Sequence, residues 1–200
     1  MPSSRFLALW WPAVNSSFER RLEFGRVGEG LISRWLQSRG HLVFPAYDKE
    51  IGSGKGPQLF SAAGDLVLPD ILAFYGNRIQ WVEAKHKSCF TWHRITRRWT
   101  TGIDIRHYNE YRQVSANTRL PVWLMFWHPQ SKPDEKDVAY GCPPECPTGL
   151  FGNELEALAK LENHRSDKWG RTGMVYWAVD SLRLIARAES LSLAEWMASK

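Results

Sequence analysis

Three ionisable residues lie in two neighbouring segments that otherwise have the composition of buried strands. Asp70 interrupts the apolar run of residues 65–75, and Glu83 and Lys85 lie in the next run, residues 78–87. A charged group is costly to bury unless a partner compensates it. These two carboxylates and the lysine are therefore the first candidates for chemistry.

A short turn sets the relative position of these residues. Gly76-Asn77 is a dipeptide typical of a two-residue hairpin turn, and it separates the two apolar runs. In that register Asp70 lies directly opposite Glu83, and the Cβ atoms of such a pair are about 5 Å apart. Because side chains alternate with a period of two along a strand, Lys85 points to the same face as Glu83.

Two interpretations fit this grouping. In the first, Lys85 neutralises the carboxylates and the set is a structural ion pair. In the second, Asp70 and Glu83 bind Mg²⁺, which prefers oxygen ligands from one or two carboxylates together with water and phosphate. The carbonyl of Ala84 is a further candidate ligand. Lys85 would then position or deprotonate an attacking water, or neutralise charge at the transition state.

The first predicted helix offers another carboxylate. Residues 15–40 carry apolar residues at helical spacing, and Ser16 with Glu19 fits a capping box at the start of the helix. Glu29 falls on the same stripe as the apolar residues. We therefore expect Glu29 to point toward the sheet, where it could complete the metal site.

The pattern along the rest of the chain predicts an α/β fold. Hydrophobic periodicity and turn residues divide the chain into elements. Strands are expected at 41–47, 65–75, 78–87, 119–129, 173–180 and 182–189, helices at 15–40, 103–118, 153–164 and 192–200, and loops at 48–64, 88–102 and 130–149. The order helix, three strands, helix, strand predicts a mixed central β-sheet flanked by helices, with a C-terminal extension.

The same residues resemble a known set of enzymes. Pro69-Asp70, followed after twelve residues by Glu83-Ala84-Lys85, resembles the PD-(D/E)xK nuclease superfamily, which includes restriction enzymes and Holliday-junction resolvases. The resemblance extends to the preceding helix, with its glutamate in "GRVGEG". It implies a restriction endonuclease-like core over about residues 16–129. It also implies cleavage of DNA phosphodiester bonds with Mg²⁺ or Mn²⁺.

The resemblance also implies roles for individual residues. Glu29, Asp70 and Glu83 would hold the metal, and Lys85 would be the catalytic lysine. Some relatives add a Gln or Tyr from the helix after the catalytic strand. The auxiliary candidates from residues 103–118 are Tyr111 and Gln113, together with His107, which could face the same site.

Positive charge is concentrated after the catalytic strand. The chain has a net charge of +5, and residues 85–112 hold seven basic residues against two acidic ones, which leaves the rest of the chain neutral. A local basic excess favours a phosphate-bearing partner, although a solvated positive face would look the same. The candidate contacts are Lys87, Arg94, Arg97 and Arg98 to phosphates, and Trp99 (with Trp92) to an unpaired base.

Cysteine content and composition narrow the class of protein. Hydrophobic residues make up 44% and charged residues 24% of 200 residues, as in globular domains. We expect one domain over 1–200, with a core at about 16–129 and an extension at about 130–200.

No apolar run reaches the ~20 residues of a membrane span, so no membrane partner and a cytoplasmic location are expected. Cys142 and Cys146 could bind zinc, but two thiols without a second pair favour free cysteines.

Taken together, these observations predict a metal-dependent DNA endonuclease or junction resolvase. Its DNA could be duplex, branched or single-stranded, RNA stays open, and a homodimer is consistent with small resolvases of the superfamily. The alternatives are a non-catalytic nucleic-acid-binding module on the same fold and a protein in which Glu83 and Lys85 form only a structural ion pair.

Overall fold

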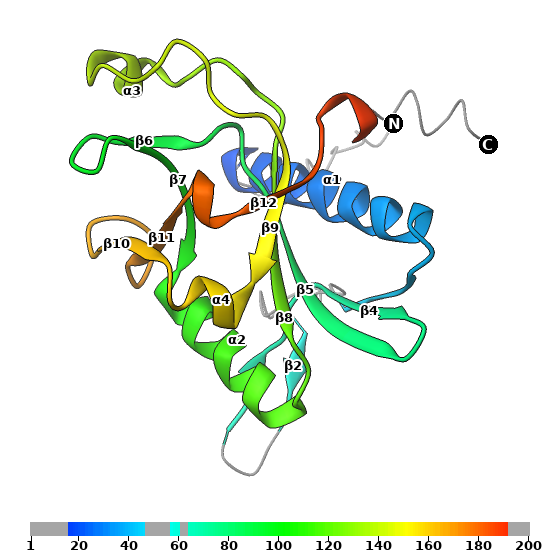
Figure 1. Cartoon of the computed structure of the whole chain (residues 1–200). Helices are drawn as coiled ribbons and strands as arrows, with labels where there is room; N and C mark the ends of the chain where they lie inside the picture. The colour runs from blue at the N-terminus through cyan, green and yellow to red at the C-terminus, as the bar shows by residue number, and fades with distance from the viewer. Residues whose placement is uncertain (1–15, 47–56, 61–63, 192–200) are drawn as a thin grey trace, which may run out of the picture.

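A six-stranded mixed sheet forms the centre of the protein (Figure 1). The computed structural model describes residues 16–46, 57–60 and 64–191, with side chains from residue 25 onward. The strand order is β1 (Leu42–Pro45), β4 (Ile71–Tyr75), β5 (Arg78–His86), β8 (Val122–His128), β9 (Gly149–Glu154) and β12 (Arg183–Ala186). Strands β5 and β8 occupy the middle of this sheet and pair in parallel, whereas all other neighbours are antiparallel.

Two helices cover opposite faces of the central strands. Helix α1 (Ser16–Ser38) contributes Ile32 and Leu36 to an apolar cluster with Val82, and α2 (Ile105–Thr118) contributes Tyr108 and Val114 to the cluster on the other face. For the central sheet and its two covering helices, the expected order of helix, three strands, helix and strand is confirmed as α1, β1, β4, β5, α2 and β8. The chain thus has the predicted α/β fold, a mixed central sheet flanked by helices.

The β4–β5 hairpin has the predicted register. Tyr75 lies opposite Arg78 and Ile71 lies opposite Val82. Gly76 has a φ of +55°, the left-handed conformation that a two-residue hairpin turn requires. The next position beyond the last β4 pair is Asp70, so the expected juxtaposition with Glu83 follows from the observed pairing.

One glycine lets α1 approach β5. A Cβ atom placed on Gly28 would lie 2.4 Å from the Cβ atom of His86, closer than real Cβ contacts come. Any larger residue would push the helix away from β5. This contact fixes the part of α1 that carries Glu29.

Several predicted elements differ from the structure. Residues 88–102 are not a loop, because β6 (Thr91–His93) and β7 (Arg98–Asp104) form a hairpin there, and α2 begins only at Ile105. Residues 153–164 are not one helix; they contain the end of β9, the four-residue α4 (Leu155–Leu158) and the start of β10 (Glu162–Ser166). The helical spacing of Leu155 and Leu158 is real, but it lasts for a single turn between two strands.

Other differences are smaller. Residues 65–75 form two strands, β3 (Leu66–Val67) and β4, because Pro69 between them lacks a backbone donor. Strand β2 (Gln58–Leu59) pairs with β3 inside a predicted loop, and α3 (Glu135–Ala139) lies in another. The capping box at Ser16 and Glu19 and the helix at 192–200 lie outside the described side chains and residues.

The C-terminal extension contributes strands to the central sheet and to a second sheet. Strands β9 and β12 widen the central sheet, whereas β10 and β11 (Met174–Ala178) pair with β7 and β6 in a second, four-stranded sheet. Two short 3₁₀ segments, Val179–Ser181 and Glu189–Leu191, follow the last strands. No helix within the described part of the chain is long and apolar enough to cross a membrane.

Candidate active site

Asp70 reaches across the open end of the β4–β5 hairpin. Its Oδ2 atom accepts a hydrogen bond of 3.0 Å from the backbone N–H of Ala84. Burial raises the pKa of Asp70 to about 7, and the nearby Glu83 charge adds to the rise, while Lys85 and the Ala84 N–H oppose it. The two carboxylates therefore share one small region, as the hairpin register predicts.

The Glu83 side chain is completely buried, and Lys85 compensates only part of its negative charge. Its Oε1 atom forms an ion pair with the ammonium group of Lys85, which is partly exposed. Neither Glu83 oxygen has a hydrogen bond of regular geometry with a described residue, although the Tyr111 hydroxyl and the Asp70 carboxyl interact with this carboxylate. A buried carboxylate without well-aligned donors is costly. The Glu83 carboxylate is therefore the group in the site that most requires a further positive partner.

Lys85 is held in its charged form. Burial alone would lower its pKa, but the Glu83 and Asp70 carboxylates outweigh burial and raise the pKa above its ordinary value, with a smaller contribution from Glu29. An ammonium group with a raised pKa is a poor general base. Of the roles expected for Lys85, the geometry therefore favours positioning and charge neutralisation over deprotonation of water.

Glu29 approaches the site from the other side of the sheet. It belongs to α1, which packs on the face formed by Val82 and Ala84, whereas Glu83 and Lys85 alternate with them and face α2. Within the part of the chain that the structure describes, no three His, Cys, Asp or Glu side chains cluster closely enough to hold a metal. The structure thus brings Asp70 and Glu83 together, while Glu29 lies near Lys85 without joining them in such a cluster.

The donor set still fits a hard divalent cation. Asp70 and Glu83 offer oxygen ligands, and Mg²⁺ commonly binds one or two carboxylates and completes its shell with water and phosphate. The C=O of Ala84 points to the same strand edge as its N–H, beyond the last pair with β4. The complete burial of the Glu83 carboxylate, without a hydrogen bond of regular geometry to either oxygen, is the observation that favours a cation here.

Helix α2 supplies one wall of the site. Tyr111 is buried, and burial together with the Glu83 and Asp70 charges raises the pKa of its hydroxyl, so this group stays protonated. His107 stacks on the Tyr111 ring at 5.7 Å, and burial and the Lys85 charge lower the pKa of its imidazole. Both candidates therefore lie next to the residues that they were expected to assist.

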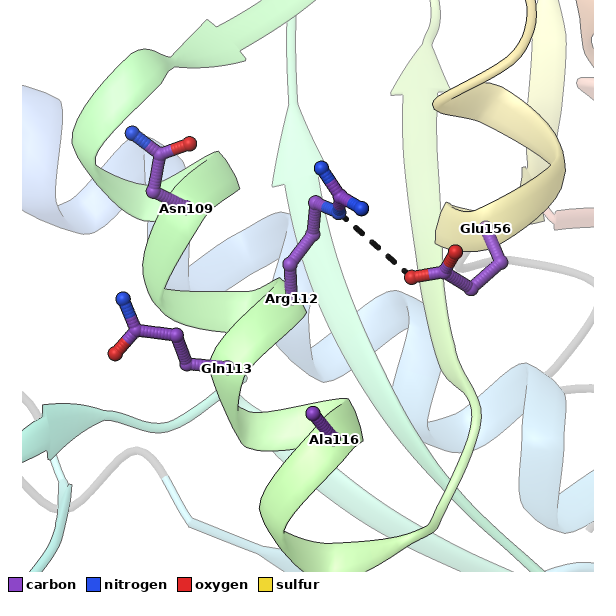
Figure 2. A pocket seen from close by; sticks show the side chains of 5 residues that line it. All are labelled: Asn109, Arg112, Gln113, Ala116 and Glu156. Atoms are coloured by element: carbon purple, nitrogen blue, oxygen red, sulfur yellow. Dashed lines mark ion pairs between the residues drawn. The ribbon is translucent and has the colours of Figure 1, made fainter.

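Gln113 lies on another side of the same helix. It is exposed and borders a shallow surface hollow, as Figure 2 shows. The other residues around this hollow are Asn109, Arg112, Ala116 and Glu156, and the Nε atom of Arg112 lies 3.7 Å from Oε1 of Glu156. Two helical residues rotate a side chain by about 200°, so Gln113 and Tyr111 cannot face the same site.

The basic candidates are in different environments. Arg97 is exposed at the tip of the β6–β7 hairpin with a φ of +50°, and Arg94 lies 5.1 Å from the ring centre of Tyr140. Arg98 donates a hydrogen bond of 2.9 Å to Asp180. Lys87 is half-buried, and burial and the Lys85 charge lower its pKa to about 8.

The structure corrects the expectation for Trp99. Only 7% of this residue is exposed, and its ring packs edge-to-face on Trp92 with the ring centres 5.2 Å apart. A ring enclosed in the core cannot stack on a nucleic-acid base. Trp99 is therefore a core residue that ties β7 to the apolar cluster beneath it.

The cysteines behave as packing residues. Cys146 is buried, its Sγ atom accepts a hydrogen bond of 3.3 Å from the backbone N–H of Phe90, and burial raises its pKa to about 12. Cys142 is partly buried, and all three cysteines are free thiols. With no described cluster of three metal ligands, the zinc interpretation gains no support.

One exposed aromatic residue was not considered from the sequence. Trp169 lies in the turn between β10 and β11, flanked by Lys168 and by Arg171. The pattern "DKWGRTG" could have indicated a basic and aromatic surface loop, but residues 153–164 were predicted as a helix, so the hairpin and its turn were missed.

Two solved protein structures are similar to this chain in the arrangement of the backbone. No protein-family model matches the chain, and no curated protein matches its sequence. A Holliday junction resolvase from the archaeal hyperthermophile Archaeoglobus fulgidus is similar, with 11% identity, a TM-score of 0.46, and coverage of 84% of this chain and 100% of that chain. A nuclease from a fusselovirus is also similar, with 10% identity, a TM-score of 0.38, and coverage of 95% and 98%.

Proposed function

We propose that this chain is a nuclease that hydrolyses DNA phosphodiester bonds with Mg²⁺ or Mn²⁺, acting as an endonuclease or junction resolvase. The observation that carries the proposal is the meeting of Asp70 with a fully buried Glu83, whose oxygens have no hydrogen bond of regular geometry with a described residue. A structure that needed only a neutral core would not require two carboxylates at this position.

The residues have distinct roles in this proposal. Asp70, Glu83 and the Ala84 carbonyl would hold the ion, which would supply Lewis-acid stabilisation of the phosphate charge when bound. Lys85 keeps its proton and places a positive charge beside the carboxylates, where it can donate a hydrogen bond to an attacking water or to a phosphate oxygen. Tyr111 and His107 restrict the position of Glu83 and Lys85 from α2.

DNA is the proposed partner because of the basic residues that follow the catalytic strand. Lys87, Arg94 and Arg97 carry positive charge that no described carboxylate pairs with, and Arg98 shares its charge with Asp180. Such residues bind phosphates through a salt-dependent release of counterions. We treat residues 1–200 as one nuclease domain and a homodimer as its proposed assembly.

A non-catalytic nucleic-acid-binding module is the second candidate. The ion pair between Glu83 and Lys85 favours it, because Lys85 compensates part of the buried charge without a metal. The two candidates differ in metal binding and turnover, since only the nuclease needs both.

A cleavage assay separates the candidates. Supercoiled, linear, single-stranded and four-way-junction DNA would each be incubated with Mg²⁺, Mn²⁺ or EDTA, beside the Lys85→Ala variant and a Lys132→Ala control at an exposed position. Metal-dependent cleavage that is lost only in Lys85→Ala supports the nuclease. Absence of cleavage with every DNA, together with no Mn²⁺ binding by calorimetry, would leave the binding module.

A further inference from the structure

The turn between β10 and β11 presents a tryptophan to solvent. Trp169 is 65% exposed, and it makes no ring contact with a described residue. Single exposed apolar residues are common on proteins, so exposure alone decides nothing. Trp169 differs from such residues because it lies in a hydrogen-bonded turn between two cationic side chains.

The turn is held in one conformation by Asp104. Oδ2 of Asp104 accepts hydrogen bonds from the backbone N–H groups of Arg171, at 3.0 Å, and Thr172, at 3.2 Å. Oδ1 accepts from the hydroxyl of Thr172 and from the backbone N–H of Arg106, at 2.9 Å. The backbone N–H of Ile105 adds a bond of 2.9 Å to the carbonyl of Gly173. The exposed indole is thus mounted on an ordered turn, which lowers the entropy lost when a ligand binds.

The same aspartate links the turn to the candidate active site. Asp104 is the N-cap of α2. His107, which adjoins Lys85, follows it by three residues, or about 4.5 Å along the helix axis. Figure 1 shows β10 and β11 beside β7, the strand that leads directly into α2. A ligand on this turn therefore lies at the end of α2 that approaches Lys85.

Two cations flank the indole. Lys168 and Arg171 are exposed, and neither side chain forms an ion pair with a described residue. By contrast, Arg106 in the first turn of α2 is paired with Glu110, and Arg98 at the start of β7 is paired with Asp180. An open aromatic face between unpaired cations suits a base and its adjacent phosphates.

We propose that the turn of residues 167–173 binds an unpaired nucleotide of DNA, with its base stacked on Trp169 and its phosphates at Lys168 and Arg171. This inference rests on the proposed function and specifies its substrate as DNA with unpaired bases beside the cleavage site. Duplex DNA keeps its bases stacked inside, so it cannot use the indole in this way.

A binding experiment without divalent metal tests the proposal apart from catalysis. Fluorescence anisotropy in EDTA would measure the Kd of the full chain for single-stranded DNA, matched duplex, and duplex with a central unpaired stretch. The variants are Trp169→Ala, Trp169→Phe and the control Leu184→Ala, which truncates another exposed apolar side chain on β12. Circular dichroism would check that each variant is folded.

The expected result is selective. Trp169→Ala should bind both DNAs with unpaired bases about ten-fold more weakly or worse, since stacking contributes roughly 1–3 kcal/mol per base. Trp169→Phe should lose less, while duplex binding and the Leu184→Ala variant should match wild type. Unchanged binding by Trp169→Ala, or an equal loss on duplex, would overturn the stacking site.

Cleavage by wild type with Mg²⁺ in parallel separates this inference from the proposed function. Cleavage without dependence of binding on Trp169 would overturn the stacking site and leave the nuclease standing. Dependence on Trp169 without cleavage would support the stacking site and count against the nuclease.

Discussion

Oδ2 of Asp70 and the backbone N–H of Ala84 form a hydrogen bond of 3.0 Å across the end of the β4–β5 hairpin. This bond replaces the ladder contact that β4 cannot make there, because β4 begins only at Ile71. It also holds the Asp70 carboxylate next to Glu83, where each negative charge disfavours the other. The hydrogen bond to Ala84 therefore keeps the two carboxylates side by side at the hairpin end.

Asp70→Asn removes the negative charge of this side chain but keeps its hydrogen bond to Ala84. The Asn carbonyl can still accept from Ala84, so the fold should persist while a ligand charge is lost. We expect cleavage to fall by at least ~100-fold and Mn²⁺ affinity, measured by calorimetry, to fall with it. Asp70→Ala removes the acceptor as well and should also lower the melting temperature. Full activity in Asp70→Asn would contradict the metal assignment.

The Glu83–Lys85 pair gives a prediction about stability. Lys85→Met leaves a completely buried carboxylate without its cation, which typically costs about 3–5 kcal/mol. The double variant Glu83→Gln/Lys85→Met removes both charges and should recover most of that loss. Urea unfolding of the two single variants and the double variant measures the coupling. Additive effects would show that the two side chains do not interact.

Lys87→Met is the matched control for this cycle. Lys87 lies two residues further along the chain and forms no ion pair with a described carboxylate. Its pKa is already lowered to about 8 by burial and by Lys85, so removing its charge should be neutral or slightly stabilising. A loss as large as that of Lys85→Met would point to general packing damage instead.

The β6–β7 hairpin should contribute to DNA affinity through charge. Replacing Arg97 and Arg98 with Ala should weaken binding to every DNA and reduce the slope of log K against log salt by about 2, one for each phosphate contact. Asp180→Asn should strengthen binding slightly, because it releases Arg98. Arg187→Ala, another exposed arginine, is the control. An unchanged salt slope would remove this hairpin from the DNA site.

His128 predicts a loss of stability in acid. It is fully buried and stacks on Phe90, with ring centres 3.8 Å apart. Burial and the Lys87 charge lower its pKa to about 3 from an ordinary value of 6.5. Between these values the unfolded chain binds a proton that the folded chain does not, so stability falls as the pH decreases from 6.5 toward 3.

His128→Leu should remove this contribution. From pH 6.5 to pH 5, wild type should lose about 1.6 kcal/mol more than the variant, because the slope approaches 1.36 kcal/mol per pH unit only below the unfolded-state pKa of 6.5. Urea unfolding at both pH values measures the difference. Parallel losses in the two proteins would mean that His128 is protonated in the folded state as readily as in the unfolded chain.

Local signals in the sequence were sufficient to predict the β4–β5 hairpin. The Gly76-Asn77 turn and the period of two along a strand are properties of neighbouring residues, so they predicted the pairing that places Asp70 opposite Glu83. Helical spacing likewise predicted α1 and most of α2. The order of the core elements followed from these local assignments, and it agrees with the structure.

Side-chain exposure depended on contacts between distant segments, so only the tertiary structure decided it. Trp99 is buried because β7 lies between β6 and β11, and the β7–β11 pairing joins residues at least 70 positions apart in the chain. The packing of α2 on the sheet turned Tyr111 inward and Gln113 outward. The turn that carries Trp169 is bound to the N-terminus of α2 because the carboxylate of Asp104 accepts a hydrogen bond from Arg171, 67 residues later in the chain. Local patterns thus determined which residues could do chemistry, whereas long-range packing determined which of them meet.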